Sequence, residues 1–393
     1  MLEFSYYSPT EIVFGRNATQ KLGEYCSKYG GTKALIIYGS ERVVRSGLLK
    51  KAADSLEAAG IPWTSIGGVE PNPRLVLVRK GIALATEFGA DFFIGIGGGS
   101  VIDTTKAVAH GTANPDLDIW DDIWLKKVPL TKTCPVASIL TIAASGSESS
   151  DSAVITNHEV TPIMKVGINT PLNRPKFAIM DPELTMTLPA YQIGCGTADI
   201  MMHTLERYFT RVQGNELSDR FACALLKNVM KNGKAMMEDP TDYHAASEIM
   251  WSGSVSHNDL TGLGGLKNME IHNLSYSLSS DFDLAHGAAL TTLWEAWAMY
   301  VLPYDEKRFR DLGAEIFGFD PDLPGENTVF AIRDYFRDAL HMPVCFSHNK
   351  FGVQSDEKIE EFVDRAMGGR DSFGSFMPLG RDDVRAIYKF ANH

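Results

Sequence analysis

Apolar residues in the first half of the chain form short runs that alternate with stretches of helical spacing. The runs at 33–38, 91–96 and 136–142 each predict one buried strand, and 63–66 predicts a shorter one. Helical spacing predicts helices between these runs, over 18–29, 48–59, 76–88 and 101–110. Strands that alternate with helices in this way predict a parallel, doubly wound sheet with helices on both faces.

The two ends of this region follow another pattern. Residues 4–14 alternate between aromatic or apolar and polar types, which predicts an opening strand or hairpin. A hairpin is predicted over 151–155 and 164–168, and a short strand at 177–180. A turn at 181–185 then closes the α/β pattern.

The second half shows helical spacing and no convincing strand alternation. The predicted helices cover 199–210, 217–237, 243–257, 286–301, 306–317, 328–340, 356–366 and 381–390. Pro182 and Pro189 punctuate the change of pattern. We therefore expect two domains, an α/β dinucleotide-binding domain over 1–185 and an all-helical metal and substrate domain over 186–393.

Two loops in the first half have the composition of nucleotide-binding turns. Gly97-Gly98-Gly99-Ser100 joins the strand at 91–96 to the next helix, where free N–H groups and the positive helix end favour a phosphate. The match to the dinucleotide fingerprint is partial, because the sixth position of the segment 95–100 is not glycine. A tight turn without a ligand is the alternative. The second loop, 143–148, is rich in serine and glycine.

A candidate metal site follows from four residues in the second half. Asp199 and His203 are four apart, so both side chains leave one face of a helix and can hold one cation. His272 and His286 would lie about 21 Å apart on one continuous helix. The segment 279–283 predicts a break, which can bring both imidazoles to the Asp199 face. A chance pair on an amphipathic helix is the alternative.

Composition excludes several classes of protein. The chain of 393 residues has a net charge of −12, which argues against nucleic acid or an anionic membrane surface as partner. Its five cysteines are scattered and contain no CxxC spacing, which fits a reducing compartment. Cys195 is interpreted as a small packing residue beside the metal site. No segment is typical of a signal peptide or membrane span, so we expect a cytoplasmic protein.

Together these segments resemble the iron-containing (group III) alcohol dehydrogenase family, in particular its NADPH-dependent butanol dehydrogenase or aldehyde reductase branch. The resemblance covers essentially the whole chain. The matching segments are 67–73, 97–103, 145–148, 181–183, Asp199-x3-His203 and 285–287. Each segment is modest alone, but their order and spacing are specific.

The resemblance implies which residues hold the cofactor and the metal. The metal, Fe²⁺ or Zn²⁺, would be held by Asp199, His203, His272 and His286. The cofactor would be held by Gly39, Ser40, Asn72, Gly98, Gly99, Ser100, Asp103, Thr141, Ser145, Ser147 and Lys165. The candidate catalytic residues are Asp103 and Tyr276. Many relatives have a histidine at the position of Tyr276. The unperturbed pKa of a tyrosine is about 10, whereas that of a histidine is about 6.5.

The expected cofactor is NADP(H) rather than NAD(H). NAD-preferring members often have an acidic residue at the end of the first central strand, where Gly39 stands here. Glu41 would repel a 2′-phosphate, whereas Arg42 or Arg45 would pair with it. The aromatic residues Trp120, Trp124, Phe282 and Trp294 are candidates for the substrate side, with core packing as the alternative.

The expected function is therefore reversible hydride transfer between NADP(H) and a small aldehyde or alcohol, with butanol dehydrogenase-like aldehyde reduction as the favoured direction. A homodimer is implied by the resemblance. Two alternatives remain open. One is a dehydroquinate synthase-like or glycerol dehydrogenase-like enzyme of the same fold, and the other is a non-catalytic nucleotide-binding protein.

Overall fold

A computed structural model describes residues 1–161 and 163–393 of the chain. The residues form two compact units. One unit contains Tyr7–Thr187, and the other contains Met1–Tyr6 together with Leu188–His393. We call them the sheet unit and the helical unit. The division lies two residues beyond the expected boundary of 185, and the first six residues belong with the C-terminal part of the chain.

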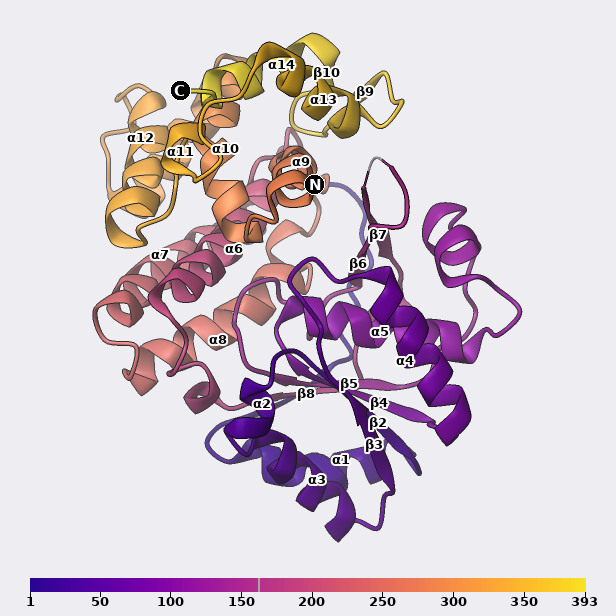
Figure 1. The fold of residues 1–393 in the computed structure, drawn as a ribbon. Coiled ribbons are helices and arrows are strands. Elements are labelled where there is room, and N and C mark those ends of the chain that lie inside the picture. The colour runs from indigo at the N-terminus through magenta and orange to yellow at the C-terminus, as the bar shows by residue number, and fades with distance from the viewer. Residues whose placement is uncertain (162) are drawn as a thin grey trace. The chain divides into compact units, whose positions relative to one another are not determined.

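The sheet unit is built on a six-stranded sheet in the order β1-β8-β5-β4-β2-β3. Figure 1 labels β8, β5, β4, β2 and β3 of this sheet. Its strands are β1 (Glu11–Phe14), β2 (Ala34–Tyr38), β3 (Trp63–Ile66), β4 (Phe92–Gly97), β5 (Val136–Leu140) and β8 (Phe177–Met180). Every neighbouring pair is parallel. The predicted parallel sheet is confirmed.

Both faces of the sheet are buried under helices, because successive side chains of a strand point to opposite faces. On one face, Ala34 and Ile36 pack into a core with α1 (Leu22–Lys28) and α3 (Leu48–Ala58). On the other face, Leu35 and Ile37 pack with α4 (Leu75–Phe88) and α5 (Gly99–Ala113). Strands buried on both faces read as continuous apolar runs, which is why the sequence pattern located them well.

The remaining elements of the sheet unit are short. They are the helices η1 (Ala18–Lys21), α2 (Arg42–Arg45), η2 (Ile119–Leu125), η3 (Pro171–Asn173) and η4 (Pro182–Leu184), and the strands β6 (Ser152–Asn157) and β7 (Met164–Asn169). The strands β6 and β7 form the predicted antiparallel hairpin. The prediction for 4–14 was too long, since only 11–14 pair with β8 and the residues before them form no strand. Exposed aromatic residues such as Tyr7 produced the misleading alternation.

The helical unit contains nine α-helices among the described residues. They are α6 (Ala190–Tyr208), α7 (Glu216–Glu238), α8 (Tyr243–His257), α9 (Glu270–Phe282), α10 (His286–Val301), α11 (Glu306–Phe317), α12 (Glu326–Asp334), α13 (Asp356–Met367) and α14 (Arg381–Ala391). Short helical turns are η5 (Leu260–Gly262), η6 (Leu302–Tyr304), η7 (Tyr335–Ala339) and η8 (Phe346–His348). One exception to the all-helical prediction is a two-residue antiparallel pair, β9 (Ser372–Phe373) with β10 (Leu379–Gly380).

Two predicted helix boundaries in this unit were wrong. The helix predicted from 199 begins at Ala190 and includes Gly194, where a Cβ would lie 2.6 Å from the Leu340 carbonyl oxygen, so that a glycine fits this close approach. The break predicted over 279–283 begins only after Phe282, which stacks on Phe351 with ring centroids 4.1 Å apart. Asp281 is held in the helix by ion pairs to Lys358 and Arg365. Tertiary contacts thus override the local turn signal.

A search of the described residues finds no helix with the length and apolar character of a membrane span.

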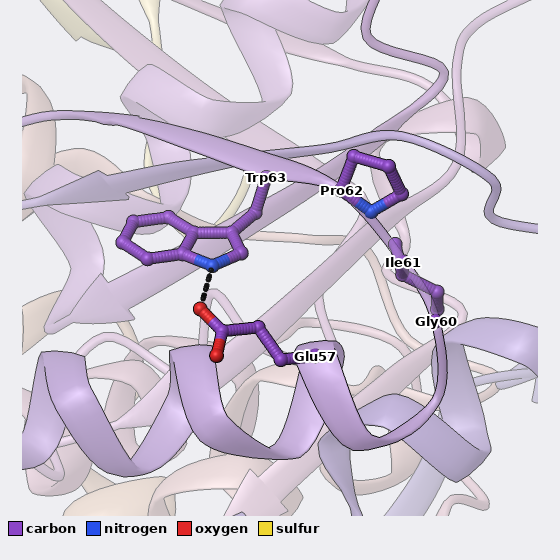
Figure 2. Close-up of a pocket in the computed structure, with 5 residues that line it drawn as sticks. All are labelled: Glu57, Gly60, Ile61, Pro62 and Trp63. Carbon is purple, nitrogen blue, oxygen red and sulfur yellow. Dashed lines mark hydrogen bonds between the residues drawn. The ribbon is translucent and has the colours of Figure 1, made fainter.

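A pocket on the sheet unit lies beside β3, where Trp63 donates to Glu57 Oε1 at 3.0 Å (Figure 2). It is lined by Glu57, Gly60, Ile61, Pro62 and Trp63. None of the predicted site residues lines this pocket, so the chemistry has to be sought elsewhere.

Candidate functional site

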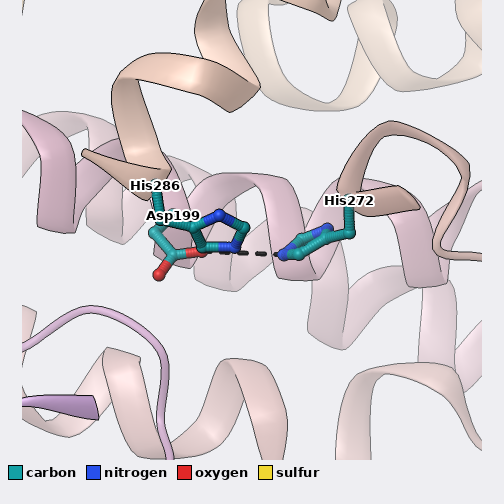
Figure 3. A group of neighbouring side chains, drawn as sticks. All are labelled: Asp199, His272 and His286. Atoms are coloured by element: carbon teal, nitrogen blue, oxygen red, sulfur yellow. Dashed lines mark ion pairs between the residues drawn. The ribbon is translucent and has the colours of Figure 1, made fainter. Parts of the chain in front are cut away.

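Three of the four predicted metal ligands, Asp199, His272 and His286, have ligand atoms within 4.8 Å of one another, and the fourth, His203, lies beside the same Asp199 carboxylate but outside this group. Asp199 Oδ1 lies 3.4 Å from His203 Nδ1, 3.7 Å from His272 Nε2 and 3.9 Å from His286 Nε2. Figure 3 shows Asp199, His272 and His286 converging from separate helical segments. Asp199 and His203 are each 3% exposed and His272 is 6% exposed, whereas the His286 side chain is 27% exposed, so the cluster is open to water on the side of His286 alone.

These separations fit a bound divalent metal. Four ligands about 2.1 Å from one tetrahedral ion stand about 3.4 Å from one another. Among the described residues, the buried atoms Asp199 Oδ1, His203 Nδ1 and His272 Nε2 have no hydrogen-bond partner. Buried polar atoms are costly when they are left unpaired. An ion held by Asp199, His272 and His286, whose ligand atoms lie within 4.8 Å of one another, would satisfy Asp199 Oδ1 and His272 Nε2. One carboxylate and three imidazoles suit both Fe²⁺ and Zn²⁺.

The local sequence explains how the ligands meet. Asp199 and His203 are one turn apart on α6, as predicted. Asp283 adopts a left-handed conformation with φ of 48° and ends α9, so that His286 can begin α10 three residues later. A Cβ on Gly287 would lie 2.1 Å from the Cys195 carbonyl oxygen. The glycine after the fourth ligand thus lets the first turn of α10 approach α6.

Burial and neighbouring charges shift the pKa values of His203 and His272 in opposite directions. Burial lowers the pKa of His203 well below its usual range. Burial also lowers the pKa of His272, but Glu206 and Asp199 outweigh that effect and raise it to about 9. Since a metal ligand must be deprotonated, metal binding near neutral pH would release a proton from His272. Cys195 is partly buried, and burial raises the pKa of its thiol to about 11, which fits the packing interpretation.

Three further residues near the cluster bear on its chemistry. Tyr276 lies one turn after His272 on α9, and its ring centroid is 6.4 Å from that of His286. His257, at the end of α8, places its ring centroid 4.1 Å from that of His203. Glu206, on α6, contacts His272 Nδ1 with its carboxylate. Both residues were missed in the sequence. Nothing in the spacing of His257 relates it to the ligands. Glu206 follows His203 by three residues on the same helix, and this spacing was a signal that could have found it.

The predicted cofactor residues of the sheet unit lie mainly at the carboxyl ends of its central strands. The strands β2 and β4 are neighbours, although β3 lies between them in sequence. The chain therefore leaves this pair in opposite directions, and such a switch point is where open α/β sheets bind ligands. Gly39 and Ser40 follow β2, Gly98 to Ser100 follow β4, and Thr141 follows β5.

The glycine turn is packed too closely for side chains. A Cβ on Gly99 would lie 2.3 Å from Ser145 Oγ, and a Cβ on Gly98 would lie 3.1 Å from Ile142 Cβ. The turn leads into α5, whose first residue is Gly99. Predicted cofactor residues of two loops thus meet at the helix end that attracts a phosphate.

Asp103 and Lys106 tie the second loop to α5. Ser147 Oγ donates to Asp103 Oδ1 at 2.5 Å, and the Val154 N–H donates to Asp103 Oδ2 at 2.9 Å. Lys106 is 1% exposed and donates to Ser147 Oγ at 2.8 Å and to the Ser152 carbonyl at 2.7 Å. Burial lowers the pKa of Lys106 to about 8. One oxygen of Asp103 therefore holds the loop through Ser147, and the other holds β6 through Val154. Lys106, three residues further along the helix, was missed.

Two other predicted cofactor residues meet each other. Lys165 Nζ donates to Asn72 Oδ1 at 2.9 Å, although the two are 93 residues apart. Asn72 has a positive φ of 55°, which asparagine tolerates better than most residues.

Three of the aromatic residues considered for the substrate side are buried, since Trp120, Trp124 and Trp294 are 3% exposed or less. Trp120 and Trp124 belong to the core of the sheet unit, which favours the alternative of core packing.

Comparison with known proteins agrees with this picture. A family profile described as iron-containing alcohol dehydrogenase matches residues 9–182, and the C-terminal profile of the same family matches residues 195–392. The chain belongs to the iron-containing alcohol dehydrogenase family. This membership confirms the expected enzyme class, a metal-dependent oxidoreductase of alcohols and aldehydes. It also implies a nicotinamide cofactor and iron.

Individual relatives in this family cover three quarters of the chain or more. The NADH-dependent butanol dehydrogenase A of Clostridium acetobutylicum is 37% identical over 99% of both chains. The NADPH-dependent aldehyde reductase YqhD of Escherichia coli is 31% identical over 75% of both. The crystal structure of the NADH-dependent butanol dehydrogenase A of Thermotoga maritima superposes with a TM-score of 0.93 at 33% identity, covering 100% of this chain and 99% of that one.

Proposed function

We propose that this enzyme transfers a hydride reversibly between NADP(H) and a small aldehyde or alcohol at a metal held by Asp199, His203, His272 and His286. The observation that supports the site is the position of Asp199 Oδ1 within 4 Å of a nitrogen of each histidine. When bound, the metal polarises the carbonyl oxygen and the nicotinamide supplies the hydride. We propose Fe²⁺ as the resident ion, with Zn²⁺ as the competing one.

Other residues of the chain would bind the pyrophosphate, position the serine loop and donate a proton. Gly98 to Ser100 offer backbone N–H groups at the start of α5 for the pyrophosphate. Asp103 holds the serine loop in place through Ser147, which supports a positioning role for it and not direct contact with the reacting atoms. The Tyr276 hydroxyl is the proposed proton donor to the product alcohol. Replacing Tyr276 with Phe should lower kcat, and replacing it with His should restore activity with an altered pH profile.

The preference for the 2′-phosphate rests on the end of β2. Gly39 leaves no carboxylate at the strand end, and the exposed Ser40 follows it. Arg42 is drawn away from this place, since its guanidinium contacts the Thr187 carbonyl and hydroxyl. The names of the relatives point both ways, because the Clostridium enzyme is NADH-dependent and the Escherichia coli reductase is NADPH-dependent.

The deciding experiment offers butanal to the metal-reconstituted enzyme with NADPH or NADH and follows the absorbance of the reduced nicotinamide. Rapid loss with NADPH that a chelator abolishes is the expected result. Loss only with NADH would keep the reaction and overturn the cofactor preference. No loss with either cofactor, with Fe²⁺ and Zn²⁺ each loaded, would favour the dehydroquinate synthase-like enzyme or the non-catalytic nucleotide-binding protein.

We further propose that the enzyme is a cytoplasmic homodimer. The five cysteines are free, which fits a reducing compartment. The edge strand β1 exposes 43% of Phe14, and the segment before it exposes Phe4 and Tyr7. Light scattering should give twice the mass of the chain, and a monomer mass at micromolar concentration would refute the dimer.

A further inference from the structure

The carboxylate of Glu206 is fully buried one turn from His203, and its contacts are all directed at the start of α9. Glu206 is 0% exposed. Its Oε2 is in hydrogen-bonding contact with His272 Nδ1. Its Oε1 accepts from the Ile271 N–H at 2.6 Å and more weakly from the His272 N–H at 3.4 Å. A single side chain from α6 thus satisfies three donors of another helix.

These donors belong to the first turn of α9, whose N–H groups have no partners within the helix. The N-cap residue, Met269, supplies no side-chain bond to them. A negative charge is also favoured at the positive end of a helix. Glu206 therefore caps α9 from outside and fixes where the helix begins relative to α6, which holds Asp199 and His203.

The same contact sets the orientation of the His272 ring. When Nδ1–H donates to Glu206, the lone pair of the neutral imidazole stands on Nε2. That atom lies 3.7 Å from Asp199 Oδ1 and has no hydrogen-bond partner among the described residues. Metal-ligating histidines generally donate their second ring N–H to a carboxylate, which fixes the tautomer and the ring.

We propose that Glu206 is a positioning residue that holds His272 as the Nδ1–H tautomer and thereby presents Nε2 to the metal. The proposal rests on the four-ligand centre proposed above. Because the Ile271 N–H can only donate, a glutamine at position 206 would turn its carbonyl oxygen toward Ile271. Its NH₂ group would then face His272 Nδ1, which would have to accept. The ring proton would move to Nε2 and block that atom as a ligand.

The test measures the Zn²⁺ affinity of the full-length enzyme by competition with a chromophoric chelator. Glu206→Gln should bind Zn²⁺ about 10- to 100-fold more weakly than the native enzyme. Glu270→Gln is the matched control, because Glu270 is also 0% exposed in the first turn of α9. Its carboxylate accepts from the Trp297 Nε1–H at 2.6 Å and from the backbone N–H groups of Phe376 and Met377. We expect the control variant to keep native Zn²⁺ affinity.

Equal affinity of Glu206→Gln and native enzyme would overturn the positioning role, and so would an equal loss in both variants. Failure of the native enzyme to bind Zn²⁺ or Fe²⁺ would instead refute the proposed metal centre itself. A second measurement needs no variant that might misfold. In the zinc-loaded native enzyme with ¹⁵N-labelled histidine, His272 should show a bonded Nδ1–H proton, with the assignment made from His272→Gln. A proton on Nε2 would contradict the proposal.

Discussion

The nucleotide edge of the sheet unit and the metal cluster of the helical unit are built from different parts of the chain. The nucleotide edge is made largely of backbone, with Gly98 and Gly99 at the start of α5 and no room for a Cβ at Gly99. The metal cluster is made of side chains from α6, α9 and α10. A backbone site requires the absence of side chains. A side-chain site requires that separate helices pack so that their ligand side chains meet at one point.

The largest expected effect is on the side-chain site. His272→Ala should reduce aldehyde turnover at least about 10³-fold, because several kcal/mol of stabilisation at the carbonyl oxygen depend on the metal. Metal content per chain should fall with it. The dissociation constant for NADPH, measured by fluorescence, should stay within about threefold of the native value. A variant that retains both metal and turnover would show that His272 is no ligand.

The helical unit should also respond to pH through Glu270. Burial raises the pKa of Glu270 to about 7 from an ordinary value of 4.5. The folded state therefore binds more protons between these values, so the stability present below pH 4.5 is lost as pH rises through 7. The loss should reach about 3 kcal/mol, and Glu270→Gln should remove this part of the pH dependence. Urea unfolding at pH 5 and pH 8 measures it, and parallel behaviour of variant and native enzyme would contradict the assignment.

The backbone site should fail in a complementary way. Gly99→Ala places a Cβ 2.3 Å from Ser145 Oγ, and overpacking of this kind costs about 1–3 kcal/mol. We expect the KM for the nicotinamide cofactor to rise about 10- to 100-fold with metal content unchanged. Gly167→Ala is the control, since its Cβ would meet Val154 Cγ2 at 3.4 Å. Loss of metal from Gly99→Ala would break the distinction between the two sites.

The smallest effect concerns cofactor choice. A Cβ on Gly39 would meet its nearest atom, Val101 Cγ2, at 3.5 Å, so a side chain fits there. Gly39→Asp should move the ratio of kcat/KM for NADPH over NADH about tenfold toward NADH, because the carboxylate would repel a 2′-phosphate and accept from a 2′-hydroxyl. Steady-state kinetics with both cofactors measures the ratio. An unchanged ratio would show that the end of β2 does not read the ribose.

The same contrast explains what the sequence could predict. The strand β8 matches its predicted bounds, because residues buried on both faces form short apolar runs. The edge strand β3 also matches, although its residues are only partly buried. The pair of Asp199 and His203 was visible as a spacing within one helix. The strand order, the contact of Asn72 with Lys165 and the approach of His257 to His203 depend on contacts between distant segments. No local pattern encodes such contacts.

The division of the chain has a consequence for synthesis on the ribosome. Residues 7–187 form the sheet unit and are complete before the helical unit has emerged. The first six residues belong to the helical unit, and the Leu2 N–H donates to the Gly264 carbonyl at 2.8 Å. This segment is among the earliest to leave the ribosome, yet it has to wait for a partner made more than 250 residues later. Until then the backbone of this segment lacks the hydrogen bond to Gly264 that it has in the folded chain.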